Sequence, residues 1–362
     1  MILSKYILRR FFYSLLILWG VVTVVFMLFN VLPGDPARMM LGQRTDLNSI
    51  EAVKKELGLD KPKSLQYLRY INELSPVSVF NLKNKESFFY YDTAKYGNKK
   101  VILHFSSNKA LLLKWPYLGR SFQSKKNVGA IIGETLPNTF ILAFAAIVFA
   151  SILGIALGIT AAIKKDSVFD RLSLFFSAFG MSLPSFFAAI LIGWFFAFVL
   201  GKYTHLNLTG NLYEVDNLGM GEHLMLKNLI LPAFTLGIRP LAIVVQLSRN
   251  SMLEVLSQDY IRTAKAKGLS FSQVIWHHAL KNSLNPVITA ISGWFASLMA
   301  GVVFIEYIFG WKGLGYVIVD ALNNYDMPLV LGCILTISLI FIIINWLVDA
   351  AYTLIDPRIK MI

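Results

Sequence analysis

The chain has 362 residues, of which 56% are hydrophobic and only 15% are charged, and its formal charge is +13. Soluble proteins carry about 25% charged residues. The apolar content excludes a disordered chain, and a surface this poor in charge does not suit a DNA-binding protein, so no nucleic-acid partner is expected. The single cysteine, Cys333, excludes a disulfide scaffold and any multi-cysteine metal site. Composition therefore predicts a polytopic membrane protein.

Six stretches are long and apolar enough to cross a bilayer as helices, because a span needs about 20 apolar residues and must pair its own backbone groups. Five of them contain no Asp, Glu, Lys or Arg, and the remaining one, 228–248, is interrupted only by Arg239. The five are residues 11–34, 135–163, 172–201, 282–305 and 327–348. An even number of spans places both termini on the same side of the membrane.

The distribution of Lys and Arg predicts which side that is. With a cytoplasmic N-terminus, the cytoplasmic segments contain thirteen Lys and Arg, whereas the short outer loops contain three. Positive residues accumulate in cytoplasmic loops. We therefore expect residues 1–34 to form a cytoplasmic N-terminus and an uncleaved first span, and residues 356–362 to form a cytoplasmic tail.

The largest segment outside the membrane is 35–134, which we place on the extracytoplasmic side. Its first half predicts two short helices, one capped by Asn48 or Ser49 and ending at Gly58, the other capped by Ser64 and ending at Ser75. Its second half predicts strands at 101–105 and 110–115. Two strands are marginal by themselves, so they are expected to pack on another element.

The cytoplasmic segment 249–285 predicts a helix over 256–267, a left-handed end at Gly268 and a second helix over 274–280. Ser270 and Gln273 match a capping box at the start of the second helix. The pattern fits either a docking surface or an ordinary amphipathic loop.

The chain contains no phosphate-loop motif and no hydrolase or zinc-protease motif, so neither an enzyme nor a cofactor is expected. The adjacent His277 and His278 point about 100° apart on a helix and form a poor metal site. Arg239 is costly in a membrane. It lines a translocation path, pairs with a backbone carbonyl freed by Pro240, or extends its charged end out of the membrane core. The other ionisable residues are not central in a span, which disfavours ion-coupled transport.

Two spans carry small residues every four positions, a spacing that lets helix backbones approach closely. Generic bundle packing is sufficient to explain both stripes. They comprise Ala150, Gly154, Gly158 and Ala162 in the second span, and Thr289, Gly293, Ser297 and Gly301 in the fifth.

Several strings in a fixed order resemble the first of the two permease subunits of bacterial ABC importers for dipeptides and oligopeptides. The strings are Leu32-Pro-Gly-Asp-Pro-Ala37, Glu134-Thr-Leu-Pro-Asn-Thr139, Ser182-Leu-Pro-Ser-Phe186, Leu229-Ile-Leu-Pro-Ala233, Arg249 to Gly268, His278 to Val287 and Asp356-Pro-Arg358. The resemblance implies an all-α integral membrane fold, a six-helix type I ABC importer permease, with an extracytoplasmic α+β insertion. Residues 135–355 would form the five-helix core.

In that family a cytoplasmic Glu-Ala-Ala motif, separated by three residues from a following Gly, forms a coupling helix that docks on an ATPase subunit. Here Arg262, Thr263 and Ala264 occupy the motif positions, and Gly268 is in register. The resemblance therefore implies that the 256–280 loop couples to an ATPase, with roles for Asp259, Tyr260, Arg262, Thr263, Ala264, Lys265, Gly268 and His278.

The implied function is one half of an alternating-access pore for di- or oligopeptides. Its partners would be a second permease subunit, two ABC ATPases, an extracytoplasmic solute-binding protein and membrane lipid, in a bacterial inner membrane. A permease for nickel or another small solute, and a partner-independent secondary transporter, remain alternatives.

Residues 76–113 form an extra insert relative to that family, which assigns them no role. Residues 81–126 contain ten Lys and Arg against two Asp and Glu. This excess predicts either a basic platform for an acidic binding protein or anionic lipid, or a solvated lysine-rich face.

Overall fold

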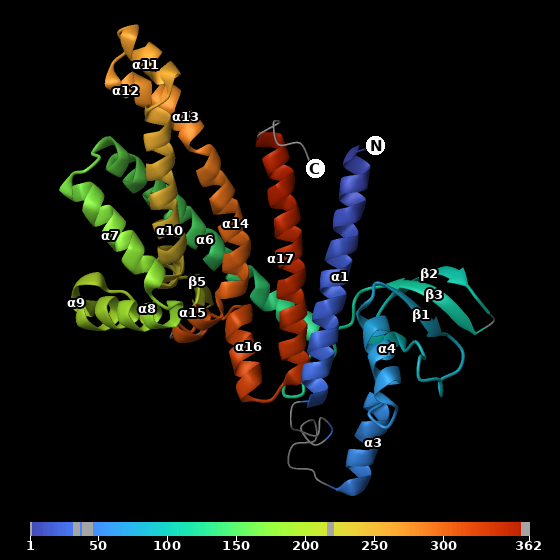
Figure 1. The fold of residues 1–362 in the computed structure, drawn as a ribbon. Helices are drawn as coiled ribbons and strands as arrows, with labels where there is room; N and C mark the ends of the chain where they lie inside the picture. Colours follow the sequence, from blue (N-terminus) through green and yellow to red (C-terminus); the bar gives the residue numbers. More distant parts are fainter. Residues whose placement is uncertain (1, 32–36, 38–45, 107, 216–220, 356–362) are drawn as a thin grey trace. The chain divides into compact units, whose positions relative to one another are not determined.

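The computed structural model describes residues 2–31, 37, 46–106, 108–215 and 221–355 (Figure 1). Positions 32–36 of the first predicted motif and the predicted tail 356–362 lie outside these residues. The chain forms two compact units. The larger unit comprises Met1–Tyr6, Thr135–Val319 and Ile337–Ile362, and the smaller unit comprises Ile7–Glu134 and Asp320–Thr336.

The smaller unit contains most of the first apolar helix and the segment predicted to be extracytoplasmic, which includes a three-stranded antiparallel sheet with strand order β1-β3-β2. Its elements are α1 (Ile2–Val31), α3 (Leu47–Leu57), α4 (Lys63–Leu74), β1 (Val77–Asn81), α5 (Thr93–Tyr96), β2 (Lys99–His104) and β3 (Lys109–Lys114).

The two short helices form as predicted, but their caps differ. Asp46, rather than Asn48 or Ser49, caps α3 by accepting a hydrogen bond from the Ser49 backbone N–H. α4 begins after Pro62 without a side-chain cap, so the predicted Ser64 cap is wrong. Proline at this position has its φ angle already near the helical value and no backbone N–H left unsatisfied.

Both predicted strands are confirmed as β2 and β3, and the element on which they pack is a third strand, β1. On one face of the sheet, side chains of β1 and β3 are buried against a cluster of aromatic side chains, whereas all residues of β2 are exposed. Phe80, Ala110 and Leu112 lie in this cluster with Tyr91 and Tyr96, which come from the segment that crosses the sheet. β1 has the alternation of a half-buried strand, but its short length hid it in the sequence.

The larger unit is almost entirely helical. Its elements are α6 (Val128–Ile163), α7 (Val168–Ser182), α8 (Ser185–Ile192), η1 (Gly193–Val199), α9 (Gly201–Thr204), β4 (Tyr213–Val215), β5 (Glu222–Leu224), α10 (Lys227–Leu256), α11 (Asp259–Ala266), α12 (Phe271–Gln273), η2 (Val274–Ala279), α13 (Leu280–Ser283), α14 (Asn285–Gly301), α15 (Val303–Ile308), α16 (Leu314–Asn323) and α17 (Met327–Ile355). The first residues of α6, the end of α16 and the first part of α17 belong to the smaller unit.

Four helices among the described residues are long and apolar enough to cross a membrane: Leu8–Leu28 within α1, α6, α10 and Met327–Ala350 within α17. The predicted third span is instead broken, because α7 and the segment Ser185–Val199 meet at 111°. The break lies at Leu183, whose extended backbone is the conformation favoured before a proline such as Pro184. The predicted fifth span corresponds to α14, which has only 17 residues. The full count of six spans therefore stays a prediction.

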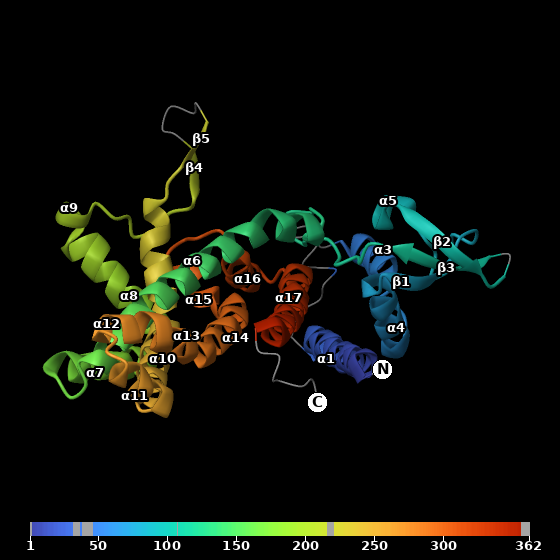
Figure 2. The same cartoon turned by 90° about the horizontal axis from the view of Figure 1, so that it is seen from above.

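The core of the larger unit lies among α6, α10, α14 and α15. Leu142, Leu236, Met299, Ile305 and Trp311 are buried in it. Figure 2 shows α10 beside α14 and α7 in the view from above, in agreement with Figure 1. This core supports the helical loop that extends beyond the end of α10.

Candidate functional site: the helical loop beyond α10

The loop predicted at 249–285 is a compact helical hairpin at the end of α10 (Figure 1). The predicted helix over 256–267 is interrupted, because α10 continues to Leu256 and α11 begins at Asp259 after a turn at Ser257 and Gln258. Gly268 has a φ of 84°, the left-handed conformation predicted for it. Ser270 and Gln273 form the predicted capping box, with both reciprocal hydrogen bonds present.

The second arm of the hairpin contains a feature that the sequence did not reveal. After one turn, α12 passes into a π-helical stretch, η2, before α13 continues toward α14. A π-helical turn shifts the angular position of the residues that follow it. Val274, Ile275 and Ala279 consequently all face the protein interior.

An apolar contact surface holds the two arms together. Ile261 and Ala264 lie on the inner face of α11 and are buried against Met252 of α10 and Val274 of η2. Ile261, Met252 and Val274 have no exposed surface. Ala264, one of the predicted coupling residues, is therefore part of the packing and not of the exposed surface.

The opposite face of α11 is exposed to solvent. It carries Asp259, Arg262, Thr263 and Lys265, all predicted coupling residues. The Asp259 carboxylate forms an ion pair with Arg262 on the next turn, with a distance of 3.5 Å between Oδ1 and Nη1. Both side chains are more than three-quarters exposed. Exposed pairs of this kind contribute little to stability, so these charges are free to meet a partner surface.

Three aromatic side chains enlarge the exposed surface of the hairpin. Trp276 is 67% exposed, Phe271 51% and Tyr260 41%. Sequence reasoning proposed Tyr260 but missed the other two, although large apolar residues in an otherwise polar cytoplasmic loop were a usable signal. Exposed aromatics beside charges are the composition of a protein-docking surface.

Tyr260 also links the two arms. The Asn282 side-chain amide donates to the Tyr260 hydroxyl at 2.9 Å and to the His278 carbonyl oxygen at 3.3 Å. His278, another predicted coupling residue, is half-buried on the second arm. Lys265 lies 5.9 Å from the ring centre of Phe271 across the Gly268 turn.

A buried ion pair fastens the base of the hairpin to α7. The Arg249 guanidinium donates to both carboxylate oxygens of Asp170, with a distance of 2.7 Å for the Nη2–Oδ2 contact. Asp170 is only 2% exposed and also accepts a hydrogen bond from the Asp166 backbone N–H. The two residues are 79 positions apart, and sequence reasoning did not pair them.

Arg239 lies on an exposed side of α10 and borders a cavity of about 90 Å³ together with Gly180, Trp294 and Ser297. Among the described residues it has no hydrogen-bond or ion-pair partner. The carbonyl contact considered for it is therefore not formed within this part of the chain. Its guanidinium is available to the cavity or to a partner subunit.

The glycines of α6 are packed closely against α10. A Cβ at Gly154 would lie 2.7 Å from a methyl carbon of Val244, and one at Gly158 would lie 2.7 Å from Ser248 Cβ. In contrast, a Cβ at Gly293 would meet no described atom within 4 Å, so the structure provides no close approach there. The structure does not describe the surroundings of Gly301.

A buried carboxylate organises the other end of the bundle. Glu306, with no exposed surface, accepts hydrogen bonds from Thr139 Oγ1 at 2.7 Å, from the Gly315 N–H at 2.7 Å and from the Tyr316 N–H at 3.2 Å. It thus ties α6 and α15 to the N-terminus of α16. Sequence reasoning assigned no such role to Glu306.

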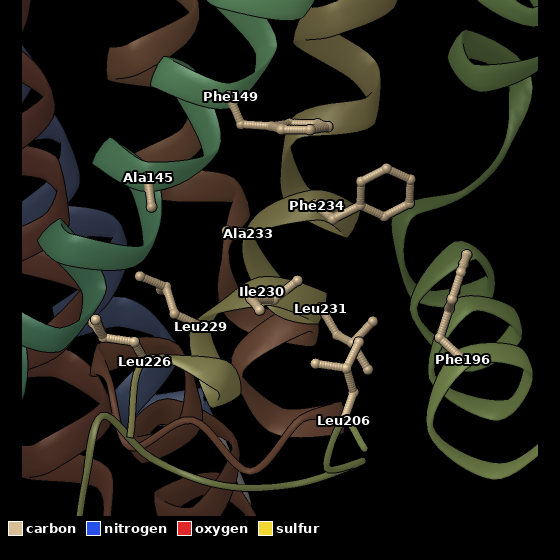
Figure 3. Close-up of a pocket in the computed structure, with 10 residues that line it drawn as sticks. All are labelled: Ala145, Phe149, Phe196, Leu206, Leu226, Leu229, Ile230, Leu231, Ala233 and Phe234. Atoms are coloured by element: carbon tan, nitrogen blue, oxygen red, sulfur yellow. The ribbon is translucent and has the colours of Figure 1, made fainter. Parts of the chain in front are cut away.

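A pocket of about 410 Å³ lies between α6, η1 and α10 (Figure 3). All ten of its lining residues are apolar, and Phe149, Phe196 and Phe234 project into it from the three elements. A peptide site needs polar groups for the charged ends of the substrate. This pocket has no polar side chain to bind the charged ends of a peptide.

Among the described residues, no group of three or more potential metal ligands occurs.

Two family models match the sequence. The model described as "Binding-protein-dependent transport system inner membrane component" matches residues 154–361, and a model for the N-terminal part of such membrane components matches residues 3–85. The chain belongs to this family. It is accordingly a multi-pass inner-membrane protein, and the predicted resemblance to ABC importer permeases is confirmed.

Several family members are similar over nearly the whole chain. The dipeptide transport system permease protein DppB of Alkalihalophilus pseudofirmus is 34% identical, covering 98% of this chain and 99% of the relative. The di/tripeptide permease DppB of Pseudomonas aeruginosa and the dipeptide permease DppB of Escherichia coli K12 are each 33% identical and cover 98% of both chains.

A solved structure shares the fold. It is an inward-facing conformation of the MetNI methionine ABC transporter, with a TM-score of 0.50 and 13% sequence identity. The match covers 63% of this chain and 97% of the other. The helical ABC importer permease fold of the family is thus confirmed.

Proposed function

We propose that the chain is the transmembrane permease subunit of an ATP-driven ABC importer for dipeptides or oligopeptides. The observation that carries the proposal is near-full-length similarity to three permeases named for dipeptide or di/tripeptide transport. The helical hairpin beyond α10 supports the same function, because it presents charges and aromatic rings on a packed, ordered base.

In this proposal the hairpin is the contact with an ATPase subunit. Asp259, Arg262 and Lys265 provide a charged face, and Phe271 and Trp276 provide apolar anchors that an ATPase groove would bury. The ion pair between Asp170 and Arg249 then transmits movement of the hairpin to α7, since it joins the base of the loop to that helix.

The complete importer would contain a second permease subunit, two ATPases and an extracytoplasmic solute-binding protein, with membrane lipid around the permeases. We place both termini in the cytoplasm on the basis of the Lys and Arg distribution. Closure of the ATPases on ATP would alternate access to the pore, and hydrolysis would reset it.

The test is uptake by the reconstituted complex. Proteoliposomes containing the chain, its partner permease, the two ATPases and the binding protein should accumulate labelled di- or tripeptides only when ATP is present. Peptides of two, three and six residues and Ni²⁺ would be compared. Uptake of Ni²⁺ without peptide uptake would overturn the peptide assignment, and uptake by the purified chain without ATPases would overturn the ATP-driven mechanism.

A further inference from the structure

The two faces of the extracytoplasmic sheet differ in what covers them. In the strand register, Val77, Leu113 and Lys100 form one row across the sheet, and Val79, Leu111 and Leu103 form the next. These rows lie on the face opposite the aromatic cluster. We call this surface the outer face and define it by Val77, Val79, Lys100, Leu103, Lys109, Leu111, Leu113 and Trp115.

The outer face is apolar and open to its surroundings. Leu103 is 53% exposed, Val77 46% and Leu113 45%, and Trp115, which follows Leu113 by two positions, is 84% exposed. Contiguous exposed apolar surfaces of this kind mark contacts with proteins or membranes.

The charges at the outer face have a single sign. Lys100 and Lys109 are exposed, and none of the three strands contains Asp or Glu. An apolar surface bordered by lysines and a tryptophan matches the boundary of a bilayer with anionic headgroups, where aromatic rings and basic side chains gather.

A chain of contacts holds the sheet beside the first membrane span. Tyr67 of α4 shares a hydrogen bond of 2.6 Å with Thr23 of α1, and the Phe26 ring lies 5.1 Å from the Tyr67 ring and 5.7 Å from the Tyr70 ring. Thr23 and Phe26 both lie within the apolar stretch Leu8–Leu28. α4 is therefore fastened to the part of the span nearest the extracytoplasmic segment.

The sheet is in turn fastened to α4. The Asn72 side chain donates to the Val79 carbonyl oxygen and accepts from the Val79 N–H, each at 2.9 Å. Only two residues separate the end of α4 at Leu74 from the start of β1 at Val77. Figures 1 and 2 both show α4 between α1 and the sheet. The outer face is thereby held close to the bilayer that surrounds α1.

We propose that the outer face rests on the extracytoplasmic leaflet of the membrane. The valines and leucines enter the boundary between headgroups and acyl chains, Trp115 lies at headgroup depth, and Lys100 and Lys109 contact anionic lipid phosphates. The position beside α1 favours lipid over a soluble protein as the occupant, because the bilayer is already present there. This inference does not depend on which solute is transported.

The test uses the full chain in vesicles of phosphatidylethanolamine and phosphatidylglycerol. With Cys333 replaced by alanine, a fluorescent label is attached to L113C or V79C on the outer face, or to A94C as the matched control. Ala94 is exposed on α5, which belongs to the segment on the aromatic side of the sheet. Lipids carrying a quencher in the upper acyl chain should quench the outer-face labels at least about twofold more than the control label.

Two further arms separate the possible occupants. K100E/K109E should reduce quenching of the label at position 113 in phosphatidylglycerol vesicles and have less effect when phosphatidylcholine replaces that lipid. Equal quenching at positions 113, 79 and 94 would overturn the proposal. Protection of the outer-face labels only after a soluble binding protein is added would also overturn it and would assign the surface to that protein.

Discussion

At the scale of single residues, the two ion pairs near the helical hairpin contribute differently to the free energy of unfolding. Asp170 is buried, Arg249 is largely shielded from solvent, and two hydrogen bonds join them, whereas Arg262 and Asp259 are exposed and 3.5 Å apart. Removing one partner of a buried pair leaves a charge in a poorly solvated place, while water replaces an exposed partner readily. The buried pair is therefore structural, and the exposed pair remains available for a partner.

Arg249→Ala is expected to lower the free energy of unfolding by about 3–5 kcal/mol, because it leaves the Asp170 carboxylate unpaired. Arg262→Ala is the matched control, with an expected change below about 1 kcal/mol. Denaturant titration of the purified chain in detergent, followed by circular dichroism, measures both. Equal effects of the two substitutions would contradict the distinction.

Lys114, the last residue of β3, makes a pH-dependent contribution to the free energy of unfolding. Burial lowers the pKa of its ammonium group to about 8, with Glu73 opposing this shift and Lys95 adding to it. Its ordinary pKa is 10.5, so between these two values the unfolded chain binds the proton more strongly than the folded chain does. Stability should therefore rise with pH over this window and receive no such gain below pH 8.

Lys114→Met should flatten this rise, whereas Lys100→Met, which changes an exposed lysine of the same sheet, should preserve it. Pulse proteolysis in urea at pH 7, 8 and 9 measures the stability of the segment. The comparison stays below about pH 10, where ionisation of tyrosines in the unfolded chain begins to oppose the rise. An unchanged slope in Lys114→Met would refute the assignment.

At the scale of elements, the turn at Gly268 determines how α11 meets the second arm of the hairpin. Its φ of 84° is costly for residues with a side chain, and a Cβ at this position would meet no described atom within 4 Å. A substitution there therefore acts through the backbone and not through a collision. The effect of a substitution at Gly268 can therefore be attributed to the left-handed backbone conformation, because the packing of the hairpin is not disturbed.

Gly268→Val is expected to reduce peptide uptake and ATPase association, since the left-handed conformation costs a β-branched residue at least about 1–2 kcal/mol. Gly268→Asn is the matched control and should retain more of both, because asparagine enters this conformation more readily. Uptake in proteoliposomes and co-purification of the ATPases are the measurements. Normal values for the valine variant would remove the coupling role of the turn.

At the scale of the whole molecule, the chain divides into a helical unit with the hairpin and a unit that combines most of the first apolar helix with the three-stranded sheet. The proposed orientation places the hairpin and the sheet on opposite sides of the membrane. It requires the loop after β1 to be accessible from outside the cell and α11 to be accessible from the cytoplasm.

Single cysteines test this orientation in intact cells. Lys85→Cys should react with a membrane-impermeant maleimide, whereas Arg262→Cys should react only after the cells are opened. Both positions are exposed. The natural Cys333 is buried, so the unsubstituted chain should not react with the maleimide and serves as the control for background labelling. The reverse labelling pattern would invert the topology.

Features that depend on local chemistry can be predicted from the sequence. Long apolar runs specify α1, α6, α10 and α17, because the bilayer demands length and internal hydrogen bonding. Gly268 and the Ser270 capping box specify the turn of the hairpin, since both act within a few residues. The family likewise follows from ordered strings along the chain.

Features that depend on contacts between different elements could be recognised only in the folded chain. Three features are of this kind. Arg249 pairs with Asp170, Glu306 accepts hydrogen bonds from Thr139 and from α16, and β1 adds to the sheet. The sharp bend at Leu183 had a local signal in Pro184, but its 111° angle required the folded chain. Local propensity indicates where elements form, whereas burial and long-range hydrogen bonds decide which of their faces meet.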